Sequence, residues 1–111
     1  MPFTVRPSRT FQRKTKELLK KYVSLKKELA ELTLSLQENP KQGVELGRNC
    51  YKVRLAIESK RKGKSGGARI ITYLVTENEE LILLTIYDKS QKANLAKGEL
   101  DVLLESFENE S

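Results

Sequence analysis

The sequence contains no histidine and only one cysteine, Cys50. Without histidine, Ser-His-Asp and Cys-His catalysis, histidine acid–base chemistry and nearly every transition-metal site are excluded. A single cysteine excludes an internal disulfide and any multi-cysteine zinc site. We therefore expect no metal and no cofactor, and chemistry that depends on Lys, Arg, Tyr, Asp, Glu and backbone groups.

Long apolar runs are also missing. No stretch approaches the roughly 18 residues that span a membrane, and the N-terminal MPFTVRPSRT lacks the apolar segment of a signal peptide. We expect a soluble, cytoplasmic protein with no membrane partner. With 111 residues, 38% of them hydrophobic and 32% charged, the chain fits one globular domain, predicted over residues 1–111.

Charge is abundant and unevenly distributed, with 21 Lys and Arg against 15 Asp and Glu. Residues 1–40 and 41–72 each carry nine basic side chains, against four and two acidic ones, whereas residues 73–111 carry three basic and nine acidic. A basic body with an acidic C-terminal part predicts a polyanionic partner, with nucleic acid ahead of a membrane. A generally basic, solvated surface is the alternative.

Hydrophobic periodicity predicts the N-terminal elements. Residues 3–5 read as a short edge strand stopped by Pro7. Ser8 is a plausible N-cap for a first helix, and a second helix with a leucine stripe over residues 25–36 must end near residues 39–40. Together these two helices form a helical hairpin.

The rest of the chain predicts a sheet and one more helix. Residues 50–57 alternate between apolar and basic side chains, and residues 69–76 and 81–87 are nearly continuous apolar runs, typical of a central hairpin covered on both faces. Leucines over residues 100–107 mark a final helix. The order β-α-α-β-β-β-α gives an α+β domain, with the helical hairpin and C-terminal helix packed on a small antiparallel sheet.

Lys52 and Arg54 lie two positions apart on a predicted strand, so both project from one sheet face, roughly 7 Å from each other. Adjacent cations repel unless an anion lies between them, and a ligand phosphate is the natural candidate. The alternative is an edge strand that uses charge to prevent aggregation.

A basic, glycine-rich loop over residues 58–68 (ESKRKGKSGGA) separates this strand from the next. Its glycines let backbone N–H groups approach an anion, and Lys62, Lys64 and the following Arg69 supply charge, although a flexible basic hairpin loop would look the same. If the three strands are adjacent, five side chains converge on one concavity while Asp88 points away: Lys52, Arg54, Arg69, Tyr87 and Lys89.

Three segments resemble the RelE/ParE superfamily of type II toxins, and its HigB-type members most closely: GKSGGARII (63–71), LTIYDKS (84–90) and KVRL (52–55). The resemblance covers essentially the whole chain. It implies a toxin that cleaves mRNA, usually on the ribosome, to arrest translation, and that is neutralised by a cognate antitoxin. We expect that antitoxin to be a helix-turn-helix protein with an acidic contact surface.

The resemblance implies a metal-independent endoribonuclease site. Arg69 would contact the non-bridging phosphate oxygens with Arg54 beside it, and Lys52 or Lys64 would position or deprotonate the 2′-OH. Tyr87 would stack on a base or hydrogen-bond the phosphate, unless it is a rim aromatic that only packs on the last helix. Lys89 is the candidate proton donor to the 5′-oxygen. Further phosphate-binding residues are expected in the loop: Lys60, Arg61, Lys62 and Lys64.

The sequence departs from the RelE pattern because its last predicted helix contains no tyrosine, which leaves the proton-transfer roles open. Two other functions remain as alternatives. A ParE-like protein would inhibit gyrase by binding it and would need no nuclease site. The basic cluster on the predicted strands argues against this alternative. A non-catalytic RNA-binding module usually presents exposed aromatic platforms, and this chain has only four tyrosines and three phenylalanines.

Overall fold

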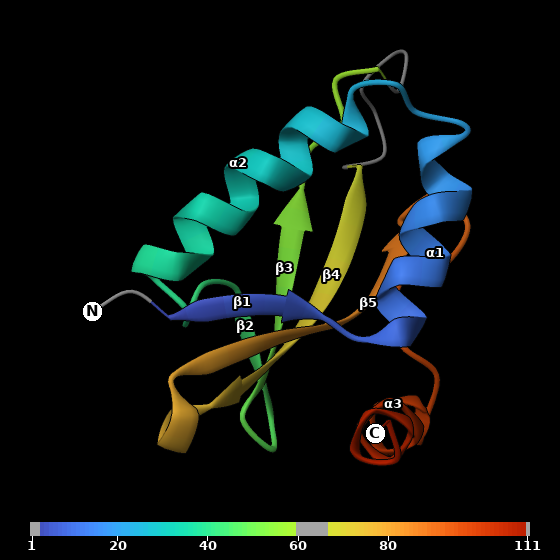
Figure 1. Ribbon diagram of the computed structural model, residues 1–111. Helices are drawn as coiled ribbons and strands as arrows, with labels where there is room; N and C mark the ends of the chain where they lie inside the picture. Colours follow the sequence, from blue (N-terminus) through green and yellow to red (C-terminus); the bar gives the residue numbers. More distant parts are fainter. Residues whose placement is uncertain (1–2, 60–66, 111) are drawn as a thin grey trace.

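The computed structural model describes residues 3–59 and 67–110. Within these residues it has an α+β architecture, as predicted (Figure 1). The elements follow in the order β1 (Thr4–Pro7), α1 (Arg9–Leu19), α2 (Leu25–Glu38), β2 (Val44–Gly47), β3 (Cys50–Leu55), β4 (Ala68–Val75), β5 (Glu80–Asp88) and α3 (Glu99–Glu108).

The strands form one sheet in the order β1-β5-β4-β3-β2, so β1 and β2 are its edges and β3, β4 and β5 lie in its interior. Neighbouring strands are antiparallel except β1 and β5, which are parallel. The expectation of a wholly antiparallel sheet is therefore wrong at this pair. Short turns join β2 to β3 and β4 to β5, and they require antiparallel pairing. In contrast, two helices follow β1, and they leave its direction in the sheet free.

Sequence reasoning missed β2, a four-residue strand paired with the start of β3. The strand is too short to show an alternating pattern. Gly43 precedes it with a φ of +96°, and a Cβ there would lie 2.2 Å from the carbonyl oxygen of Lys52. Glycine is therefore required where the chain enters this edge.

Ser8 caps α1 as predicted, because its Oγ accepts a hydrogen bond from the Phe11 N–H (3.0 Å). The same hydroxyl donates to the Leu84 carbonyl (2.9 Å), and the Ser8 N–H donates to the Leu83 carbonyl (2.9 Å). The cap therefore also fixes the start of α1 against β5. The second helix, α2, ends at Glu38, and its C-cap Asn39 directly precedes Pro40, where the backbone before a proline disfavours helix.

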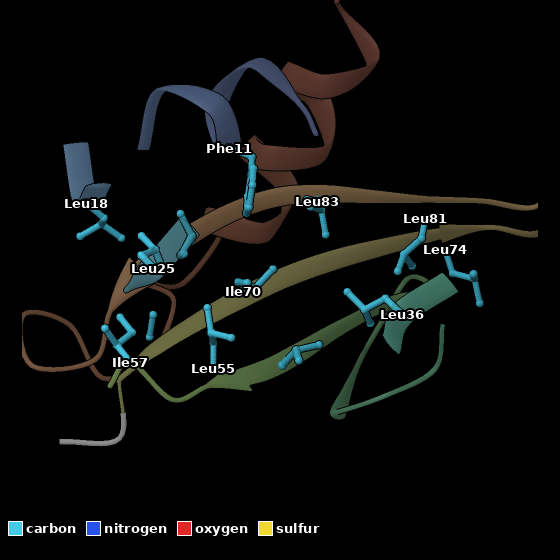
Figure 2. Packing of buried hydrophobic residues seen from close by; sticks show 13 residues of the cluster. Phe11, Leu18, Leu25, Leu36, Leu55, Ile57, Ile70, Leu74, Leu81 and Leu83 are labelled. Carbon is cyan, nitrogen blue, oxygen red and sulfur yellow. The ribbon is translucent and has the colours of Figure 1, made fainter. Parts of the chain in front are cut away.

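One face of the sheet is covered by α1 and α2, which diverge from their short connection at residues 20–24 (Figure 1). Figure 2 shows Phe11 and Leu25 of these helices directed toward Ile70 and Leu55 of the central strands. Leu25 and Leu36, at the two ends of the predicted leucine stripe, are fully buried. The stripe is therefore core, and its burial is the main force that holds α2 on the sheet.

The opposite face packs on α3 through a second cluster. Leu103 and Leu104 of α3 meet Ile71 of β4 and Leu84 of β5. The central strands are thus covered on both faces, which explains why their sequences are nearly continuous in apolar residues. The chain has no helix, within its described parts, that is long and apolar enough to cross a membrane.

Candidate functional site

Arg54, Arg69 and Tyr87 form a row across three strands. Arg54 of β3 pairs directly with Arg69 of β4, and Arg69 pairs directly with Tyr87 of β5. Opposite residues in a sheet project from the same face. The register therefore brings two predicted arginines and the predicted tyrosine together, on the face that also carries α3.

The hydrogen-bond alternation fixes how close the two arginines come. The Leu74 N–H donates to the Asn49 carbonyl (2.8 Å), which makes their pair a hydrogen-bonded one. Hydrogen-bonded and non-hydrogen-bonded pairs alternate along an antiparallel ladder, and Arg54–Arg69 lies an odd number of pairs from Asn49–Leu74. Arg54 and Arg69 therefore form a non-hydrogen-bonded pair, in which the Cα atoms are about 4.5 Å apart and the side chains are at their closest. Like charges directly opposite each other destabilise a sheet, so this pair is a place where an anion would stabilise the fold.

Arg69 lies in the interior of the sheet rather than on its surface. Only 7% of the residue is exposed, whereas Arg54 beside it is exposed. The Arg69 Nη1 donates to the carbonyl oxygen of Ala68 (3.1 Å). A charged side chain is almost never this buried without a specific purpose, and a guanidinium presents its donors in a planar fork that matches phosphate.

Lys52 lies two residues before Arg54 on β3, and Lys52, Arg54 and Arg69 together form the basic row of this face. Lys52 is half-buried and lies on the same face as Arg54, because Val53 between them belongs to the core of the opposite face. Its Nζ donates to the Oδ1 of Asn94 (3.1 Å). The connection between β5 and α3 therefore reaches over this face, and the predicted alternation of β3 is confirmed.

Tyr87 is packed more deeply than a stacking platform would be. The residue is 9% exposed and belongs to the α3 core cluster, and its hydroxyl has no hydrogen-bond partner in the described parts of the chain. Burial raises the pKa of Tyr87, Arg69 opposes that increase and Glu99 adds to it. The phenol therefore stays neutral at physiological pH and can act as a hydrogen-bond donor.

Lys92 and Glu99 adjoin Tyr87 and were not predicted. The Lys92 Nζ lies 5.3 Å from the centroid of the Tyr87 ring and donates to both Glu99 carboxylate oxygens (2.7 and 2.6 Å). The Ala96 N–H donates to the same carboxylate (2.8 Å). A sequence signal exists for Glu99, because an acidic residue in the first turn of a helix suits the helix dipole. No sequence pattern points to Lys92.

Asp88 points away from the row, as predicted. It is 2% exposed and lies on the α1 side, where its carboxylate accepts hydrogen bonds from the Tyr22 hydroxyl (2.6 Å) and from the Ser90 N–H and hydroxyl (2.9 and 2.7 Å). These bonds fix the turn that follows β5. Lys89 in this turn is half-buried, and its N–H donates to the Gly67 carbonyl (3.0 Å), which extends the β4–β5 ladder by one pair.

Gly67 opens β4 in a conformation that only glycine adopts readily. Its φ is +64°, and a Cβ there would lie 2.1 Å from the Leu55 carbonyl oxygen. This steric reason differs from the predicted anion-binding role of the loop glycines. The other predicted loop residues lie outside the described part of the chain: Lys60, Arg61, Lys62, Gly63, Lys64 and Gly66.

A mixed five-stranded sheet with a basic row beside α3 defines a small α+β domain suited to an anionic ligand. The sequence matches the model of the family described as RelE toxin of the RelE/RelB toxin-antitoxin system over residues 8–108. The chain therefore belongs to the RelE toxin family, and the resemblance to the RelE/ParE superfamily is confirmed.

Solved structures share this fold. A mutant of the Escherichia coli toxin RelE in the free state is 16% identical, with a TM-score of 0.58 over 84% of this chain and 90% of its own. The RelBE2 toxin–antitoxin complex from Mycobacterium tuberculosis contains a chain that is 16% identical, with a TM-score of 0.54 over 79% and 99%. The isolated E. coli RelE toxin is 15% identical, with a TM-score of 0.55 over 93% and 97%.

Proposed function

We propose that this RelE-family toxin is a metal-independent endoribonuclease that cleaves mRNA on the ribosome and so arrests translation. The observation that carries the proposal is the directly opposed pair of Arg54 and Arg69 on neighbouring strands. Two like charges on directly opposite strand residues destabilise the sheet, and a phosphate bound between them would relieve the repulsion. A gyrase inhibitor that acts only by binding would have no need of such a pair.

RNA carries its own nucleophile, so the protein only has to orient and activate it. The 2′-oxygen attacks the adjacent phosphorus while the bond to the 5′-oxygen breaks, which leaves a 2′,3′-cyclic phosphate on one fragment and a 5′-hydroxyl on the other. Arg69 and Arg54 bind the non-bridging oxygens, where charge grows in the transition state. The buried position of Arg69 limits reorganisation of this donor during the reaction.

Lysines handle the proton transfers in this proposal. Lys52, two residues from Arg54 on the same face, positions the 2′-OH and removes its proton, a role that Lys64 can share. A lysine in its neutral form can accept the proton of a 2′-OH within hydrogen-bond reach and so act as a general base. Lys89 protonates the departing 5′-oxygen, and the neutral phenol of Tyr87 donates a hydrogen bond within the site.

The second partner in the proposal is a cognate antitoxin. The Mycobacterium tuberculosis relative is a toxin–antitoxin complex, and the basic row of this chain is complementary to an acidic surface. We expect a helix-turn-helix antitoxin whose acidic side chains cover the row. Titrating this antitoxin into a cleavage reaction should abolish activity near one-to-one stoichiometry, and full activity in a verified complex would contradict occlusion of the site.

The function is tested with purified protein, an mRNA on translating ribosomes and EDTA in the buffer. The proposal predicts discrete cuts whose 5′ fragments end in a 2′,3′-cyclic phosphate. Binding to RNA or ribosomes without any cut would favour a non-catalytic RNA-binding module. DNA breaks that depend on gyrase, with intact mRNA, would favour the ParE-like alternative.

A further inference from the structure

A cavity of about 290 Å³ lies where β1 leaves the edge of β5. Its walls come from α1, the end of β5, the connection that follows β5 and the start of α3. The volume is at the lower end of the range for small-molecule sites. Its charged lining residues are Lys14, Glu17, Asp88, Lys92 and Glu99, and Ile86 and Tyr87 of β5 also line it.

One backbone donor and one backbone acceptor face this cavity. The bond from the Lys89 N–H to the Gly67 carbonyl sets the alternation between β4 and β5. By that alternation Ile86, paired with Ile70, has its N–H and C=O turned away from β4. β1 pairs with β5 only as far as Leu83, so this part of the β5 edge borders the cavity rather than a strand.

The charged residues that line the cavity are two basic and three acidic, so the cavity lacks the positive charge of the basic row. Lys92 is paired with Glu99, Lys14 and Glu17 contribute one charge of each sign, and Asp88 adds a buried carboxylate that is hydrogen-bonded to Tyr22 and Ser90. Partial burial of Glu99 raises its pKa, but hydrogen bonds from Lys92 and Ala96 and the positive charges nearby lower it overall. The pair is therefore ionised and mutually neutralised, and the cavity suits a neutral polar group better than a phosphate.

Tyr87 links the cavity to the proposed phosphate site. It lines the cavity and is also the direct partner of Arg69, in a hydrogen-bonded pair with Cα atoms about 5.5 Å apart. A nucleotide whose phosphate lies on Arg69 would therefore have its base within reach of the cavity. Base edges carry adjacent donors and acceptors, which match the pair of backbone groups on Ile86.

We propose that this cavity binds one nucleobase of the RNA, beside the scissile phosphate, and so sets the base preference of cleavage. The choice of ligand rests on the proposed function. Recognition combines the backbone edge at Ile86 with the polar rim at Glu17. The Lys92–Glu99 ion pair holds the wall rigid, which favours one base over the others.

Binding is tested first without any cleavage, by titrating the four ribonucleosides into ¹⁵N-labelled protein. At least one nucleoside should saturably shift the amide signals of Ile86, Tyr87 and Gln91. No shift at these amides with any nucleoside would overturn the proposal, even if the wild type cleaves mRNA. Saturable shifts in a protein that cuts no RNA would support the cavity while rejecting the nuclease function.

Specificity is tested with Glu17→Trp, which places a ring at the exposed rim, and with Glu31→Trp on α2 as the matched control. A single base contact is typically worth about tenfold in affinity. Glu17→Trp should therefore reduce cleavage at the preferred base by about tenfold relative to the other bases, and Glu31→Trp should keep the wild-type preference. An unchanged preference in Glu17→Trp, with the nucleoside shifts retained, would overturn the proposal.

Discussion

Arg54 and Arg69 face each other across β3 and β4 in the type of pair that brings side chains closest together. One of the two is exposed and the other is buried. The exposed arginine is therefore free to adjust, while the buried one is held in place by its strand. In the proposed function this combination supplies a fixed donor and a mobile one to the same phosphate, and the paired charges should oppose folding when no anion is bound.

Arg54→Gln should stabilise the free protein and weaken its activity. Removing the like charge opposite Arg69 should raise the free energy of unfolding by about 0.2–1 kcal/mol. The gain should be larger at low salt, because salt screens the repulsion. Urea denaturation at two salt concentrations checks this, with Arg13→Gln on the exposed side of α1 as the control. Equal stability of wild type and Arg54→Gln at both salt concentrations would show that the two cations do not repel.

Gly67→Ala should destabilise the fold at the entrance to β4. The substitution combines a positive φ with a Cβ 2.1 Å from the Leu55 carbonyl oxygen. Gly98→Ala is the matched control, because Gly98 also has a positive φ (+80°) but no atom within 4 Å of an added Cβ. The control should cost about 1 kcal/mol. Thermal unfolding should show a clearly larger loss for Gly67→Ala, and equal losses would contradict the steric argument.

Glu99→Gln should make stability less dependent on acid pH. The folded-state pKa of Glu99 lies below its ordinary value of 4.5. Its contribution is therefore complete above that value and is lost as pH falls through the folded-state pKa. Glu99→Gln should be less stable than wild type by up to about 1 kcal/mol at pH 7, and the difference should disappear at low pH. Denaturation curves from pH 7 to pH 2 test this, with the exposed Glu105→Gln as the control.

Cys50 should report unfolding through its reactivity. Burial raises the pKa of this thiol to about 11, and Arg48 lowers it only in part. The native thiol is therefore protonated and enclosed, whereas the thiolate is the reactive form. Labelling by iodoacetamide at pH 8 should be slow in the native protein and fast in denaturant. Rapid labelling of the native protein, with its circular dichroism unchanged, would mean that β3 opens locally.

Much of the fold could be predicted because local patterns and tertiary packing agree. The leucine stripe from Leu25 to Leu36 predicted a helix packed on a core, because an apolar helix face must be buried. The apolar runs around Ile70 and Leu84 predicted strands covered on both faces. The direction of β1 could not be predicted, because it depends on how two helices return the chain to the sheet. β2 escaped prediction because four residues are too few to show a period.

The candidate site could be predicted only in part, because much of it depends on tertiary packing rather than on local sequence patterns. Alternation along β3 placed Lys52 and Arg54 on one face, but the register between strands, which pairs Arg54 with Arg69, is a tertiary property. Lys92 approaches Tyr87 from an irregular connection that has no periodicity to interpret. The burial of Tyr87 also depends on where α3 packs on the sheet, which local sequence patterns do not predict.

The central claim is that Arg69 stabilises charge on the phosphate as the bond breaks. Single-turnover cleavage of mRNA on ribosomes by wild type and Arg69→Ala tests it most directly, with circular dichroism to verify that both are folded. Loss of a preorganised donor typically costs about 10²–10³ in rate. We predict a loss of that size for Arg69→Ala, with ribosome binding largely kept and only partial recovery in Arg69→Lys, because a point charge cannot make the bidentate contact. Equal rates for folded wild type and Arg69→Ala would contradict the account.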